Sequence, residues 1–186
     1  MPAEVAVHRL TSAQVLQMVE TGVLDEDARI ELLDGVLYAM SPQGPSHASI
    51  TVALRVALNA SFGTGFHVRD HSPIDAGPHS MPEPNLAVVR GTPRDYLTRH
   101  PAGPDIALVV EVSVTTQAYD RAKVGIYARA GVPEVWQLDV PARTLRVHTE
   151  PDTEAGEYGS IRVLRDDANA RAGLAGSEIP IRSVLP

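Results

Sequence analysis

The sequence contains no cysteine among its 186 residues. Structural disulfides and zinc sites built on thiolates are therefore excluded. No apolar run reaches the length of a membrane-spanning helix, and the first residues lack the basic-then-apolar pattern of a signal peptide. We therefore expect a cytoplasmic protein that has no membrane contact.

Positive charge is also scarce, because 16 Lys and Arg residues face 23 Asp and Glu residues, for a formal net charge of -7. Proteins that bind nucleic acid by bulk electrostatics need clustered basic side chains. Any such contact would have to use a local patch, unless the basic residues only form a solvated surface. The two candidate patches are Arg90, Arg94 and Arg99, and Arg121, Lys123 and Arg129.

The remaining composition is that of a soluble globular protein, with 44% hydrophobic and 21% charged residues. The length suits one domain, residues 1–186. Helix-like and strand-like segments alternate in the central part, which predicts a mixed α/β (α+β) fold. Towards the C-terminus we expect an edge hairpin that begins around Leu145 and Val147, and a tail that docks through Leu174, Ile179 and Ile181.

The most informative stretch runs from Ile106 to Asp139 and predicts a buried strand, a helix and a second strand. Thr115 or Thr116 would cap the helix, and Gly131 would end it. Glu111 interrupts the apolar first strand and shares one face with Ser113, since side chains alternate along a strand. A buried carboxylate is costly unless it is paired, hydrogen-bonded or bound to a metal.

Lys123, in the predicted helix, is the only lysine of the chain. It falls on one helical stripe with Asp120 and Tyr127, beside an apolar stripe of Ala118, Ala122, Ile126 and Ala130. A position that stays lysine in an arginine-rich sequence suggests a need for a compact point charge. The alternative is a chance lysine that pairs with Asp120.

An earlier segment predicts a hairpin, because Asp34-Gly35 separates two apolar runs and supplies the positive φ angles of a two-residue turn. Glu31 lies in its first strand and is either a functional carboxylate or an exposed strand residue. After a loop, Ser46 is predicted to cap a long helix that Gly63 ends. His47 in its first turn could bind an anion, but a lone histidine there is more often an incidental surface residue.

Three segments thus offer oxygen groups beside a basic residue: Glu31, the Glu83-Pro84-Asn85 junction, and Glu111 with Lys123. Metal-dependent hydrolysis of a phosphodiester needs oxygen ligands for Mg²⁺ and a cation that assists the attacking water or the developing charge. The residues of these three segments supply nearly this set of ligands and the cation.

These segments resemble a known family. The stretches that carry the resemblance are ELLDGVLYAMSPQGPSH, EPNLAVVRG, LVVEVSVTT and YDRAKVGIYARAGVPEVWQLD. They are similar to the Uma-two family of restriction-endonuclease-like proteins, within the PD-(D/E)XK nuclease superfamily. The resemblance covers about Glu31 to Asp139, and it implies a central mixed β-sheet flanked by helices with a metal site at one edge.

The resemblance also implies roles for individual residues. Glu111 matches the acidic metal ligand of the second motif, and Glu31 matches the N-terminal glutamate. The superfamily lysine normally stands where this chain has Ser113, and Lys123 matches a lysine on the next helix that replaces it, with Asp120 and Tyr127 in support.

Asn85 departs from the pattern, because the family has a metal-binding aspartate there. An amide oxygen can ligate a hard cation but brings no charge, so that Mg²⁺ should bind more weakly. Glu83 is a candidate substitute, about 7 Å along the strand.

The resulting hypothesis is an endonuclease with Mg²⁺ or Mn²⁺ held by Glu31, Asn85 and Glu111, and with Lys123 as the charge-stabilising or water-orienting group. Its substrate would be nucleic acid, with DNA favoured over RNA, and the nuclease analogy suggests a homodimer. The alternatives are an inactive nuclease-like module that binds nucleic acid or protein, and a purely structural oligomer.

Overall fold

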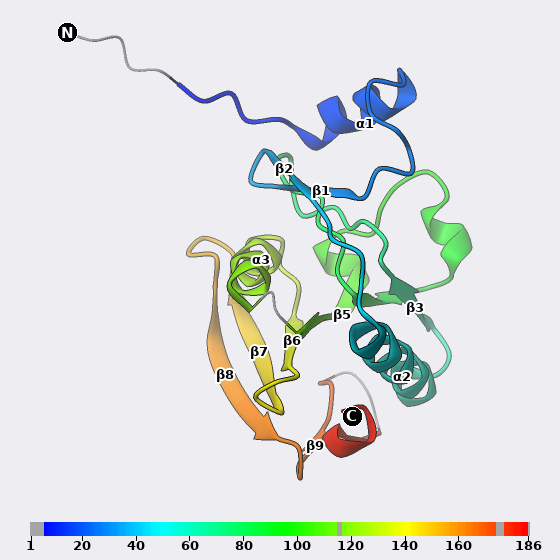
Figure 1. The fold of residues 1–186 in the computed structure, drawn as a ribbon, viewed down its shortest axis with the longest axis vertical. Coiled ribbons are helices and arrows are strands. Elements are labelled where there is room, and N and C mark those ends of the chain that lie inside the picture. Colours follow the sequence, from blue (N-terminus) through cyan, green and yellow to red (C-terminus); the bar gives the residue numbers. More distant parts are fainter. Residues whose placement is uncertain (1–5, 115–116, 174–176, 186) are drawn as a thin grey trace, which may run out of the picture.

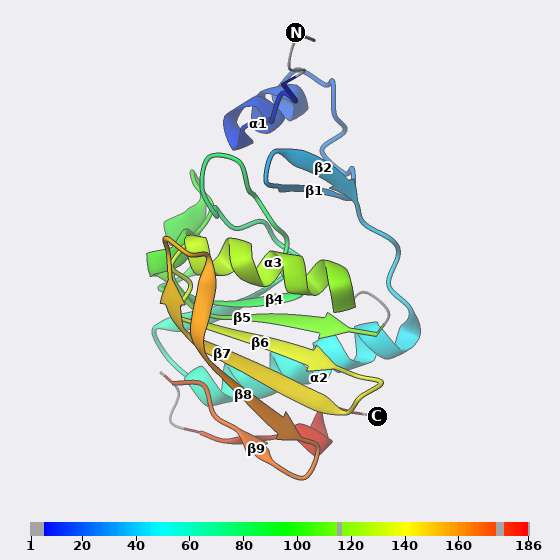
Figure 2. The ribbon, with the colours of Figure 1, turned by 90° about the vertical axis from the view of Figure 1, so that its left-hand side faces the viewer.

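The predicted mixed α/β architecture is confirmed by the structure, a computed structural model that describes residues 6–114, 117–173 and 177–185. One six-stranded sheet lies between α3 on one face and α2 with the C-terminal tail on the other (Figure 1 and Figure 2). The helices are α1 (Ser12–Glu20), α2 (Pro45–Phe62) and α3 (Gln117–Arg129). In sheet order the strands are β3 (Phe66–Asp70), β4 (Leu86–Arg90), β5 (Ile106–Ser113), β6 (Glu134–Asp139), β7 (Thr144–Asp152) and β8 (Glu157–Arg165).

Strand β5 is the centre of this sheet. It pairs in parallel with β6 through the α3 crossover, while the other neighbours in the sheet are antiparallel. All eight residues of β5 are buried. Layers on both faces therefore account for its nearly continuous apolar sequence.

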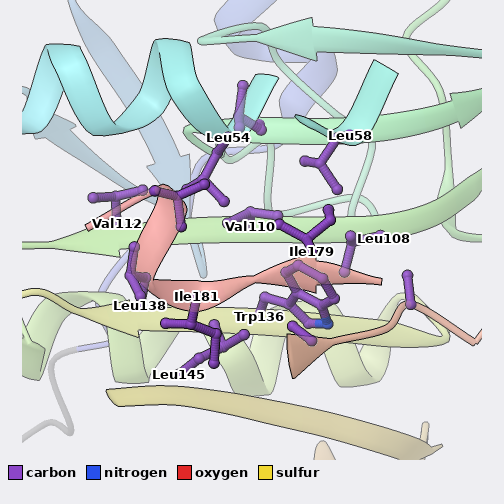
Figure 3. Close-up of a cluster of buried hydrophobic side chains, with 14 of the residues drawn as sticks. Leu54, Leu58, Leu108, Val110, Val112, Trp136, Leu138, Leu145, Ile179 and Ile181 are labelled. Carbon is purple, nitrogen blue, oxygen red and sulfur yellow. The ribbon is translucent and has the colours of Figure 1, made fainter. Parts of the chain in front are cut away.

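The larger core lies between the sheet and α2 (Figure 3). Leu54 and Leu58 of α2 meet Val110 of β5 and Trp136 of β6 there. The tail closes this core with β9 (Asn169–Ala170) and β10 (Ile179–Pro180), followed by a short 3₁₀ turn (Ile181–Ser183). Ile179 and Ile181 are buried as predicted, whereas Leu174 lies outside the described residues.

The predicted hairpin forms a separate two-stranded sheet of β1 (Ile30–Leu33) and β2 (Val36–Ala39). Asp34 and Gly35 have φ angles of 46° and 78°, as the turn requires. The loop between β3 and β4 runs alongside, where the Met81 amide donates to the Leu32 carbonyl at 2.8 Å. These contacts hold β1 above the α3 face of the main sheet (Figure 2).

One local prediction was wrong. Helix α2 begins at Pro45 with Gly44 as its N-cap rather than Ser46, because proline suits a first-turn position whose amide has no helical partner. On α3 the polar stripe of Asp120, Lys123 and Tyr127 is buried, and of the apolar stripe Ile126 is buried and Ala122 exposed. The predicted edge hairpin is confirmed: β7 and β8 pair antiparallel at one edge of the sheet, with β8 outermost.

Candidate functional site

The sheet, the hairpin and α3 bring the predicted acidic residues and Lys123 to one cavity of about 550 Å³. Glu31 comes from β1, Glu111 from the middle of β5, and Glu83 and Asn85 from the chain just before β4. These four residues, Lys123 and Asp120 all line the cavity, as does His47. The structure thus gathers segments that lie far apart in the sequence.

Lys123 is the centre of the cluster. Its Nζ lies 2.8 Å from Glu111 Oε1 and 3.1 Å from Glu31 Oε2, and it donates to the Glu83 carbonyl at 3.1 Å. The side chains of Lys123, Glu31 and Glu111 are only 2–3% exposed. One compact ammonium with three donors therefore satisfies three acceptors, a geometry that a planar guanidinium does not match.

Two tyrosines of α3 complete the hydrogen bonding of the carboxylates. Tyr127 donates its hydroxyl to Glu111 Oε1 at 2.5 Å, and Tyr119 donates to Glu31 Oε1 at 2.5 Å. The amide of Glu83 also donates to Glu31 Oε2 at 3.0 Å. Donors that favour the charged carboxylate make burial of this acidic cluster tolerable.

The ionisation of the cluster follows from burial and charge. Burial raises the pKa of Glu111, and the charge of Lys123 opposes this rise. Burial alone would lower the pKa of Lys123, but the carboxylates of Glu111 and Glu31 outweigh it and raise that pKa above its usual value. Lys123 is therefore a fixed positive charge at neutral pH.

A second buried contact, between Ser113 and Asp120, supports the Lys123 cluster. The Ser113 hydroxyl donates to Asp120 Oδ2 between β5 and α3. Ser113 and Asp120 are 3% and 5% exposed. This contact fixes the first turns of α3 against the end of β5, and so positions Lys123 one helical turn further along.

Asn85 lies in the cluster, but its side chain faces the strand backbone. Its Oδ1 accepts a hydrogen bond from the Val112 backbone amide at 2.7 Å, and the backbone amide of Asn85 lies 3.4 Å from Glu111 Oε2. An oxygen held in this way has one lone-pair direction left for another partner. Glu83 is half-buried, and no hydrogen bond to its carboxylate is found within the part of the chain that the structure describes.

The electrostatic state of Glu83 gives a testable prediction. Burial and the charge of Glu31 raise the pKa of Glu83 to about 6 from 4.5. The folded state thus binds more protons than the unfolded state between these values, so stability falls as pH rises through this window. The shift corresponds to about 2 kcal/mol, which solvent screening of a half-buried group reduces to about 1 kcal/mol.

We therefore expect Glu83→Gln to be about 1 kcal/mol more stable than the parent at pH 7 and equal to it near pH 4. Urea unfolding in EDTA at both pH values measures the difference. Glu154→Gln, on an exposed turn, is the control and should change stability at neither pH. An equal gain for both variants at pH 7 would show that the effect is one of overall charge.

Several residues of the cavity were missed by sequence reasoning. They are Arg29, Tyr38, Gln43, His71 and Tyr119. The Gln43 amide nitrogen lies 2.9 Å and 3.1 Å from the two ring nitrogens of His71. Burial lowers the pKa of both His47 and His71, so these rings are neutral at pH 7. Only tertiary contacts bring these residues together, and no local pattern marks them.

The donor set fits a hard divalent cation by its chemistry, because the cavity offers carboxylate and amide oxygens and no sulfur. Among the described residues, Glu111 Oε2 has only the 3.4 Å contact to the backbone amide of Asn85, and Glu83 lines the same cavity. Glu31 is less available, since both of its oxygens are already engaged. Among the described residues, no three His, Asp or Glu side chains are already arranged to share one ion.

Comparisons with known proteins identify the family and the fold of the chain. The model of the Uma2 family, described as "Putative restriction endonuclease", matches residues 13–182. A crystal structure from Anabaena variabilis, described as "a putative nuclease belonging to DUF820", superposes with a TM-score of 0.75 at 14% identity. The match covers 94% of this chain and 97% of that one, and it shows a shared fold. None of the curated proteins matches the chain.

No helix within the described ranges is both long and apolar enough to span a membrane.

Proposed function

We propose that this chain, which belongs to the Uma2 family, is a divalent-metal-dependent endonuclease that hydrolyses phosphodiester bonds of nucleic acid, with DNA favoured over RNA. The observation that carries the proposal is the buried Glu31–Lys123–Glu111 cluster at the floor of an open cavity. A buried cluster of charged groups in a cavity is a preferred place for catalysis. By analogy with nucleases of this architecture, the proposal includes a homodimer.

Glu111, Asn85 and Glu83 would hold Mg²⁺ or Mn²⁺, with Glu31 supporting the site through Lys123. The bound ion would supply Lewis-acid stabilisation of charge on the phosphate oxygens. With three glutamates and one lysine in contact or close by, the cavity floor carries excess negative charge that favours a cation.

In the proposed reaction a water oxygen forms a bond to phosphorus, and the bond from phosphorus to the leaving sugar oxygen breaks. The proton released by the water passes to solvent. The leaving oxygen takes a proton from solvent. Lys123 holds its positive charge beside the reacting phosphate and stabilises the developing negative charge.

A second candidate is a catalytically inactive member that binds nucleic acid or protein. Asn85 favours it, because this residue brings no charge and its Oδ1 is already engaged by the Val112 amide. Under this hypothesis the Lys123 cluster would hold α3 to the hairpin and to β5, and metal would bind weakly or not at all.

Plasmid cleavage in Mg²⁺ and in Mn²⁺ tests the proposal, with calorimetric titration of each metal on the same samples. We expect the parent protein to bind metal and cut, and Glu111→Gln to reduce both by on the order of a hundredfold or more. Glu154→Gln serves as the matched control, because it removes the same charge on an exposed turn. If the parent neither binds metal nor cuts, the binding-module hypothesis replaces the nuclease hypothesis.

A further inference from the structure

The cavity has two chemically different walls. Its floor is acidic and holds Lys123, whereas one side of its rim carries Arg29, His71, His47 and Gln43. Arg29 is exposed, and it forms no ion pair with any residue that the structure describes. A guanidinium with free donors, next to imidazole and amide donors, suits a phosphate group.

The rim residues are close enough to act together. Gln43 contacts the His71 ring, and the rings of His47 and His71 lie 6.4 Å apart. His47 Nδ1 is a buried ring nitrogen without a hydrogen-bond partner in the described part of the chain. Arg29 lines the same cavity as His71 and Glu83, and its carbonyl accepts from the Met40 amide at 2.8 Å.

The outer wall of the cavity is aromatic. Tyr38 of β2 is 41% exposed and lies edge-on to Tyr119, with ring centroids 5.5 Å apart. Tyr119 is itself fixed by its hydrogen bond to Glu31. An exposed ring on a rigid support is a platform on which an unstacked base can lie.

The size and charge of the site narrow the choice of ligand. A cavity of about 550 Å³ belongs to the size class that encloses one small organic ligand, comparable to a single nucleotide. An intact duplex keeps its bases stacked inside and would have to unpair and extrude one to reach this wall, which costs free energy that a single strand does not spend. A net charge of -7 also works against the broad basic surface that duplex binding uses.

We propose that the cavity takes one unstacked nucleotide of single-stranded nucleic acid, with its base on Tyr38 and its phosphate between Arg29, His71 and Gln43. Glu83 and Lys123 line the same cavity as these three phosphate-binding residues. The assignment of single strands as the substrate to be cut rests on the proposed function, but the binding mode can be tested without cleavage.

Binding is measured by fluorescence anisotropy in EDTA, with a labelled oligothymidylate and a hairpin duplex of equal length as probes. We expect the single strand to bind tighter than the duplex. Tyr38→Leu should weaken single-strand binding about 5- to 150-fold, because one stacked base is lost. Tyr38→Phe keeps the ring and should bind like the parent.

Arg29→Gln should weaken binding about tenfold. It should also reduce the slope of log affinity against log salt concentration by about 1, the value for one lost phosphate contact. Arg94→Gln removes an exposed arginine outside the cavity and should change neither quantity. The thermal midpoint of each variant should match that of the parent, since Tyr38 and Arg29 are exposed. Equal binding of the two probes, no binding of either, or no effect of Tyr38→Leu would overturn the proposal.

Cleavage of single-stranded circular DNA and of supercoiled plasmid by the parent protein separates this proposal from the function it refines. Preference for the single strand supports both. Equal cutting of the two substrates would leave the nuclease function standing and overturn the single-strand assignment. Tyr38-dependent binding of the oligothymidylate without any cutting would keep the binding mode and reject the nuclease function.

Discussion

Replacing Lys123 with methionine is expected to lower the free energy of unfolding by about 3–5 kcal/mol and to abolish cleavage. The change leaves Glu31 and Glu111 buried at about 2% exposure without their cation. Two carboxylates within reach of one ammonium would then repel each other in a region of low dielectric constant. Urea unfolding at pH 7 measures the loss, and plasmid cleavage measures the activity.

Two further variants show whether the missing charge is the cause. The double variant Lys123→Met with Glu111→Gln should recover part of the lost stability, because it removes one of the two unpaired charges. Arg121→Met, on the exposed side of α3, should cost little. If the double variant is no more stable than Lys123→Met, lost packing rather than charge dominates, and the account of the cluster is wrong.

Placing a carboxylate at position 85 is the second substitution for which we expect a large effect. We expect Asn85→Asp to bind Mg²⁺ and Mn²⁺ on the order of tenfold tighter or more, with a matching gain in cleavage. An aspartate there can still accept from the Val112 amide, as Asn85 Oδ1 does at 2.7 Å, and it adds a negative charge beside Glu111. Without metal the same charge should lower stability, because like charges repel.

The measurement is calorimetric titration of each metal, paired with thermal unfolding in EDTA and in saturating metal. Asn59→Asp provides the matched control, since it adds the same charge on an exposed position of α2 outside the cavity. We expect metal to stabilise Asn85→Asp more than the parent and to leave Asn59→Asp close to the parent. Unchanged metal affinity in Asn85→Asp would remove position 85 from the ligand set.

The parts of the fold that were predictable depend on local chemistry. Asp34-Gly35 defines its own turn, and the apolar run of β5 with the following α3 defines a crossover unit within a single stretch of chain. Lys123 and Tyr127 were placed on one face by helical spacing alone, and both do contact Glu111. Local periodicity was therefore enough to bring together half of the cluster.

The rest of the site depends on contacts between distant segments. Tyr119 reaches Glu31 across 88 positions of sequence because the hairpin docks over α3. The contact of Lys123 with Glu31 likewise depends on the docked hairpin, since Glu31 lies on another element. Gly103 shows the same dependence on distant segments. A Cβ there would lie 1.7 Å from the Ala130 carbonyl oxygen, so the close approach requires glycine, but no local pattern around Gly103 indicates it.

The double duty of the Lys123 cluster has a consequence for how such sequences change over time. The same ammonium that lines the cavity also fastens the β1–β2 hairpin to α3 and β5. Selection for a well-folded chain would keep Glu31, Glu111 and Lys123 in place even in a lineage that had given up catalysis. Position 85 lies outside this fastening, and either Asn or Asp there can accept from the Val112 amide, so it can change first and record whether catalysis is still under selection.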